Sequence, residues 1–199
     1  MAIVMAPYKT APERAEYKMT ATTGAITTIA ADGPVFSMRW TSSSLIAVIK
    51  RIGISVGVRT AYGTAQTTDY GLYFARSFTA SDSGGTALTL TTDNGKLDTS
   101  FPTTAFAAGD VRISTTAVIT AGTRTLDAQP MAITVAQTNA LATVFNDDWT
   151  FGETFGRQPI ILRQNEGIVI HNLFLMGATG VLRLYVTVEW AEVDKGAVK

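Results

Sequence analysis

The segment from 160 to 190, IILRQNEGIVIHNLFLMGATGVLRLYVTVEW, constrains the fold more than any other part of the chain. Its last part, Leu182–Trp190, places an apolar side chain at every second position without a break. Successive side chains of a strand point to opposite faces, so this alternation predicts a strand with one buried face. Two turn-like gaps, at 164–167 and 177–180, divide the segment. The sequence therefore predicts a meander of three consecutive strands here, with one histidine as its only candidate for chemistry.

Similar strand patterns recur along the rest of the chain and are separated by turn-forming residues. The triplet 93–95, Asp-Asn-Gly, is a tight-hairpin signal. Nine or ten short strands without a long helix predict an all-β fold, a single antiparallel β-sandwich or jelly-roll-like domain. Outside 160–190, the predicted strands lie at 35–40, 45–58, 70–76, 86–92, 111–120 and 131–136.

The strand predicted at 45–58 starts ambiguously. A helical start is left open, because a possible serine cap precedes four apolar residues at helical spacing, Leu45, Val48, Ile49 and Ile52. From Ile52 onward, strict alternation up to Val58 predicts a strand.

We expect three regions: an extended N-terminal arm at 1–16, the β-domain at 17–193 and a C-terminal tail at 194–199. Prolines in the arm disfavour a helix. The arm is either a frayed terminus or a segment that lies on a neighbouring subunit, and its apolar start is compatible with the second. Within the domain, 137–158 has no clean period but is rich in aromatic residues, which predicts an irregular loop packed over a sheet edge.

The composition excludes several classes of function. The 199 residues include no cysteine, which rules out disulfides and cysteine-based zinc sites. Sixteen basic and sixteen acidic residues cancel, so the chain has no electrostatic footprint for nucleic acid or an anionic membrane. No apolar stretch is long enough to span a bilayer, and the start of the chain lacks the pattern of a secretory signal. Only 16% of the residues are charged, while threonine (31) and alanine (27) abound, which favours a surface in contact with copies of itself or with partners.

One motif suggests a hydrolase but does not fit its context. Gly53–Gly57 matches the nucleophile-elbow pattern around Ser55, and Asp147 and His171 follow in the chain order of a hydrolase triad. An elbow needs a strand, a strained turn and then a helix, whereas the alternation here continues through the motif. The sequence therefore predicts no triad and no enzyme.

Two further groups of polar residues are candidates for a metal or catalytic site. His171 is the only histidine, and one histidine without cysteine does not build a zinc site, so we expect a surface or interface hydrogen bond. Asn146, Asp147, Asp148 and Glu153 could bind a hard cation, but they lack the spacing of a calcium loop. The same carboxylates suggest a glycoside hydrolase, which needs two acidic residues across a cleft, but nothing in the sequence indicates which two would form that pair. We expect no cofactor and no metal.

Four segments carry a resemblance to a known family: Tyr73–Ala87, Ala121–Asp127, Arg163–Gly167 and Val188–Glu192. Together they resemble a family of proteins of similar length encoded in the structural modules of tailed phages and prophages. The resemblance spans about 36–193, most of the chain. It implies a structural component of the virion, assembled in the host cytoplasm, and it implies no catalytic residues.

Among virion roles, the sequence favours a capsid decoration (cement) protein, a homotrimer at the local threefold positions of the shell that binds the major capsid protein. One alternative is a tail, baseplate or head-fibre component, or a jelly-roll shell protein. A second alternative is a carbohydrate-binding module attached to the virion. The residues predicted at the interface are Ile3, Val4, Met5, Tyr8, Trp149, Arg183 and Tyr185.

Overall fold

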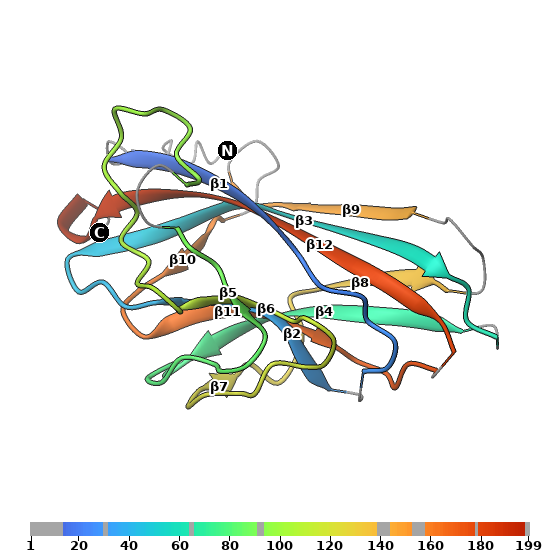
Figure 1. The fold of residues 1–199 in the computed structure, drawn as a ribbon. Coiled ribbons are helices and arrows are strands. Elements are labelled where there is room, and N and C mark those ends of the chain that lie inside the picture. Colours follow the sequence, from blue (N-terminus) through green and yellow to red (C-terminus); the bar gives the residue numbers. More distant parts are fainter. Residues whose placement is uncertain are drawn as a thin grey trace, which may run out of the picture.

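The structure, a computed structural model, describes residues 14–29, 32–63, 66–90, 94–138, 144–152, 158–177 and 179–197. Two antiparallel sheets pack face to face and enclose the core between them (Figure 1). The predicted fold class, an all-β sandwich, is thereby confirmed. Within the described residues, no helix has the length and apolar character needed to cross a membrane.

The two sheets are built from strands that are distant in sequence. The first sheet has the order β1 (Ala15–Thr22), β12 (Val181–Asp194), β3 (Leu45–Thr60) and β10 (Ile160–Leu162), with β9 (Val144–Thr150) also paired to β3. The second sheet has the order β5 (Thr86–Ala87), β6 (Val111–Ile113), β2 (Gly33–Trp40), β11 (Glu166–Asn172), β4 (Thr67–Arg76) and β7 (Thr125–Leu126), with β8 (Ala132–Gln137) also paired to β4. A short 3-10 helix, η2 (Lys195–Ala197), follows β12.

The three strands predicted at 160–190 exist, but they do not form a meander. β10 and β12 belong to the first sheet, whereas β11 lies between β2 and β4 in the second. Both connections therefore cross from one sheet to the other. The strand β11 also begins at Glu166, inside the predicted turn. Alternation reports which side chains are buried, but it does not report which strand lies alongside.

The ambiguous start at 45–58 is a strand interrupted by a β-bulge. Along β3, Arg51 pairs with Glu189 and Ile49 pairs with Trp190, so Lys50 is an extra residue. Inward-facing positions are odd-numbered before the bulge and even-numbered after it, as Ile49 and Ile52 show. This change of phase gives four apolar residues the spacing of a helix, although the backbone stays extended.

Other boundaries differ from those predicted. The region 137–158 contains β9, which the acidic pair Asp147-Asp148 concealed, since these residues are rare in strands. The strands predicted at 86–92 and 111–120 shorten to β5 and β6. β1 starts inside the predicted arm, and β12 extends one residue beyond the predicted domain.

The predicted hairpin at 93–95 is not found in its described part. Gly95 takes a positive φ of 85°. The next residue, Lys96, forms a β-bridge with Tyr17 instead of pairing with the strand that precedes the turn. The described residues of this turn therefore lead the chain toward β1.

Aromatic side chains close one end of the sandwich. Tyr17 stacks on Trp190 with ring centroids 5.2 Å apart, and Phe106 makes edge contacts with both Trp190 and Trp40. The segment 94–110 runs beside β1 (Figure 1), where the Tyr17 hydroxyl donates to the carbonyl of Pro102. This loop therefore contributes to the core.

A buried carboxyl group lies at the same end. Glu192 is 1% exposed, and its carboxylate accepts hydrogen bonds from the Thr104 hydroxyl and the Ala105 amide. Burial raises the pKa of Glu192, and these hydrogen bonds only partly oppose the shift. The folded protein thus holds this proton more tightly than the unfolded chain does.

The raised pKa predicts a sign for the pH dependence of stability. As the pH rises through the ordinary pKa of Glu192 and then through its raised value, the free energy of unfolding should fall, because the folded state binds more protons in this window. The Glu192→Gln variant should lack this fall. Urea unfolding between about pH 4 and about pH 7 measures the difference.

Glu189 provides a matched control, because its effect on the pH dependence of stability has the opposite sign. Lys18 and Arg51 hold the pKa of Glu189 below its ordinary value against the effect of burial, so its stabilising contribution is lost as the pH falls. Glu189→Gln should flatten the acidic side of the stability profile. A Glu192→Gln profile parallel to that of the wild type would contradict the assignment.

Candidate interface on the second sheet

Most of the exposed large apolar side chains of the described residues lie in two segments. One is the edge strand β8 with the residue before it, and the other is the loop that follows β11. Outside these segments, Leu97 and Val144 are the two described residues of this kind. The exposed residues of the two segments are Met131, Ile133, Val135, Phe174 and Leu175.

The strand β8 separates its two faces sharply. Ile133 and Val135 are 49% and 52% exposed, whereas Thr134 and Ala136 beside them are buried. A period of two places Thr134 and Ala136 toward the core and the two aliphatic side chains on the outer face. Solvent thus meets β-branched apolar residues at positions where an outer strand face usually carries polar ones.

Gly71 connects the two apolar segments. It pairs with Ile133 across β4 and β8, and a Cβ at this glycine would lie 3.1 Å from Cδ2 of Leu173. The Leu173 amide donates to the carbonyl of Asp69, which holds the loop after β11 against β4. Leu173 therefore lies over the sheet next to Ile133. We call Met131, Ile133, Val135, Leu173, Phe174 and Leu175 the apolar patch.

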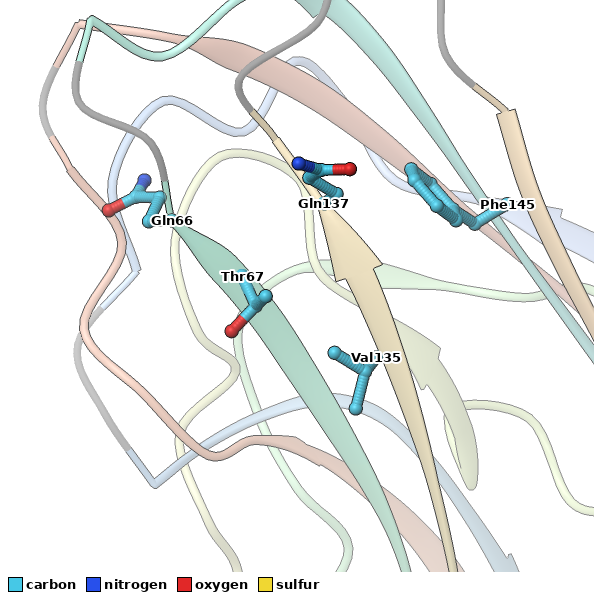
Figure 2. Close-up of a pocket in the computed structure, with 5 residues that line it drawn as sticks. All are labelled: Gln66, Thr67, Val135, Gln137 and Phe145. Atoms are coloured by element: carbon cyan, nitrogen blue, oxygen red, sulfur yellow. The ribbon is translucent and has the colours of Figure 1, made fainter.

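A cavity of about 520 Å³ opens beside the patch (Figure 2). Its lining combines amide, hydroxyl and apolar groups. The Nε2 atom of Gln66 is buried and has no hydrogen-bond partner among the described residues, while its Oε1 accepts from the Gly177 amide. The cavity could hold a small polar molecule. The lining residues are Gln66, Thr67, Val135, Gln137 and Phe145.

The outer face of the first sheet has a different character, because its charged groups pair with one another. Arg51 reaches Asp148 at 2.7 Å and Glu189 at 2.9 Å, and Lys18 reaches Glu189 at 2.9 Å. Hydrogen bonds from Arg51 to both carboxylates raise the pKa of Arg51. A partner on this face would have to desolvate pairs that are already satisfied.

Three of the residues predicted at the interface belong to the first sheet. Arg183 is exposed, and Tyr185 is half-buried with its hydroxyl accepting from Arg59. Trp149 is buried, and its Nε1 donates to Asp147 at 3.1 Å. The other four, Ile3, Val4, Met5 and Tyr8, lie outside the described residues. The interface role of all seven stays a prediction.

The apolar patch was missed by sequence reasoning. The stretch 131–136 is predicted only as a strand, with neither face assigned to the core, and its exposed face is the more apolar one. The run 173–176, Leu-Phe-Leu-Met, was interpreted as part of the strand segment. The available signal was the run of four consecutive apolar residues, because both faces of a strand are seldom buried at its end.

His171 is buried and not at the surface, while an interface role stays a prediction. Its Nδ1 lies 2.9 Å from a carboxylate oxygen of Asp32, and Nε2 has no hydrogen-bond partner among the described residues. The β-bulge at Val35 belongs to β2, and the pairing of β11 with β4 is regular, so His171 lies on the same face of β11 as Val169, as the alternation implies. Burial lowers the pKa of His171, and Asp32 opposes the shift only in part. The ring is therefore mainly neutral at pH 7.

The residues of the other weighed sites are not assembled into one. Ser55 lies within β3 of the first sheet and His171 in the second, so the structure does not bring a triad together. Asp147 accepts from Thr134 and Asp148 binds Arg51, while Glu153 lies outside the described residues. No group of three or more histidine or acidic side chains suited to a metal gathers in the described part of the chain.

A second layer covers the other end of the outer face of the second sheet. Phe78 packs on Val169, and Arg124 lies over the Phe78 ring at 5.2 Å. Arg124 also forms an ion pair with Asp82, and both side chains are almost fully buried. The Gly122 amide donates to the same carboxylate at 2.8 Å. These contacts fix the loops 77–85 and 119–127 on the sheet.

Neither a protein-family model nor a curated protein matches this chain.

Three of the four segments that carry the resemblance gather around this second layer. The loops after β4 and before β7 meet in the Asp82–Arg124 pair. Arg76 joins the third segment, since it binds Asp127 at 2.8 Å and approaches Glu166 at 3.9 Å. These three segments thus belong to one layer of the fold, which is separate from the apolar patch.

Proposed function

We propose that this protein is a structural component of a tailed-phage particle, and that it acts as a capsid decoration protein that binds the major capsid protein. The observation that carries the proposal is the apolar patch on the second sheet. Burial of apolar surface on docking favours binding by about 25 cal/mol for each Å² removed from water. The resemblance of the four segments supports the virion setting.

Composition supports the same proposal. A chain of zero formal net charge has little long-range repulsion to overcome when copies gather on a shell. Lys18, Arg51, Asp148 and Glu189 on the outer face of the first sheet already pair with one another, which favours the second sheet as the face that a partner covers. A tail, baseplate, head-fibre or jelly-roll shell role would use the same surface, and the location in the particle distinguishes these roles.

The test is co-sedimentation with empty capsids assembled from the major capsid protein encoded nearest to this chain. We expect the wild type to pellet with capsids and Phe174→Ser to lose at least tenfold in affinity, which corresponds to about 1.4 kcal/mol. Leu97→Ser is the matched control, because Leu97 and Phe174 are both 56% exposed and Leu97 lies beside β1. A wild type that binds tails and not capsids would favour the alternative role.

The cavity favours a second candidate function, a carbohydrate-binding module attached to the virion. The Gln137 amide and the Thr67 hydroxyl suit the hydroxyl groups of a sugar, and Phe145 offers an aromatic side chain. Trp149 is buried and does not offer such a face to solvent. Glycan binding that is lost in Phe145→Ala, with capsid binding absent in both proteins, would support this function over decoration.

A further inference from the structure

We infer that β8 pairs antiparallel with β8 of a second copy, so that two second sheets join into one continuous sheet across a twofold axis. The inference goes beyond the proposed function, and a twofold dimer would stand in place of the homotrimer expected from the sequence. The partner of β8, which is one part of the apolar patch, is thus a second copy of the chain. Phe174 and Leu175 in the other part of the patch stay available to contact the capsid.

The strand β8 has a free edge. Among the described strands it pairs with β4 alone. The Thr138 amide donates to the carbonyl of Gln66, which marks the even-numbered residues as those bonded to β4, because ladder bonds involve alternate residues. The backbone groups of Ile133, Val135 and Gln137 therefore point away from β4. They present donors and acceptors to a further strand.

This edge lacks the features that prevent an edge strand from pairing with another chain. Monomeric proteins protect such edges with charged side chains, proline or bulges. The six residues of β8, Ala-Ile-Thr-Val-Ala-Gln, carry no charge and no proline, and the pairing with β4 shows no bulge. By contrast, β9 at the edge of the first sheet carries Asp147 and Asp148. Like charges would oppose self-pairing of β9, whereas β8 has no charged residue of its own and its Thr134 donates to the carboxylate of Asp147.

The sequence of β8 is complementary to itself in one register. With the twofold axis at Thr134, Ile133 faces Val135 of the partner subunit, and Val135 faces the partner's Ile133. Both residues have outward-pointing backbone groups, so each such pair can form two hydrogen bonds. Their side chains share the outer face at about 5 Å, where β-branched pairs stabilise a sheet. A twofold contact of this kind is closed and uses one patch on both subunits.

The first test is the mass in solution. We expect the wild type to have twice the chain mass of 21.2 kDa by light scattering, and Ile133→Lys to have the mass of one chain. Leu97→Lys, at a similarly exposed position away from β8, should leave the mass unchanged. Ile133→Pro removes the outward-pointing amide without removing a hydrogen bond to β4 and should also give a single chain, with circular dichroism to verify folding.

The second test checks the register, because the chain has no cysteine of its own. Two copies of Thr134 face each other as a non-hydrogen-bonded pair with Cα atoms about 4.5 Å apart, within reach of a disulfide. Thr134→Cys should therefore form a cross-linked dimer on mild oxidation. Ile133→Cys should not, since it faces position 135 of the partner subunit.

The outcomes separate this inference from the proposed function. A wild type that is monomeric, or a homotrimer that persists in Ile133→Lys, would overturn the β8 contact. Cross-linking of Ile133→Cys in place of Thr134→Cys would overturn the register. A dimer that depends on β8 but fails to bind capsids would contradict the decoration role and leave the β8 contact intact.

Discussion

Replacement of Arg124 by alanine is expected to destabilise the fold by about 3–5 kcal/mol, because it leaves the carboxylate of Asp82 buried without its ion pair. The side chains of Arg124 and Asp82 are 4% and 0% exposed. Burial lowers the pKa of Arg124 to about 10, so the guanidinium stays charged at neutral pH. One amide, that of Gly122, would remain to the carboxylate. Urea unfolding of the variant measures the loss.

The surface pair of Arg76 and Asp127 is the matched control. Its side chains are 55% and 35% exposed, so Arg76→Ala should cost about 1 kcal/mol or less. The double variant Asp82→Ala with Arg124→Met removes both buried charges and should be more stable than Arg124→Ala. Equal losses for Arg124→Ala and Arg76→Ala would contradict the role of the buried pair.

Replacement of Trp190 by alanine should cost about 3–5 kcal/mol, since it empties the aromatic end of the core. Trp190 is buried and contacts both Tyr17 and Phe106. The loss should also loosen the segment 94–110, because Phe106 belongs to that segment. Urea unfolding gives the free energy, and hydrogen exchange of the amides in 94–110 reports the loosening.

A matched control for this variant is Leu97→Ala. Leu97 lies in the same segment but is 56% exposed, so its replacement should change stability by less than about 0.5 kcal/mol. If Trp190→Ala lowered stability while exchange in 94–110 stayed unchanged, the loop would be held by its backbone contacts with β1 and not by the aromatic cluster.

Local sequence patterns predicted most of the strands because alternation is a local property. The pattern of Leu182–Trp190 was correct residue by residue, since the inward residues from Leu182 onward are buried. The pairing of strands was not predictable in this way. β10, β11 and β12 follow one another in sequence yet alternate between sheets, because each pairs with a strand more than a hundred residues away. Non-local contacts decide such partners.

The candidate interface was less predictable than the fold. The alternation at 131–136 separates the larger apolar residues from the smaller residues Thr134 and Ala136, but it does not reveal that the face with the smaller residues is the one turned to the core. The conclusion that Ile133 points outward requires the position of β4. The face of β12 that carries Arg183 could be found from the pattern, but the pattern did not show that Glu189 on this face forms an ion pair with Arg51 of β3.

The bulge of β3 at Lys50 has a consequence for the residues on either side of it. β12 alternates without interruption from Leu182 to Trp190, whereas the inward positions of β3 change from odd to even numbers at Lys50. The extra residue places both runs of β3 opposite inward residues of β12. Deletion of Lys50 would therefore turn one of the two runs, the one that ends at Ile49 or the one that begins at Ile52, away from the core.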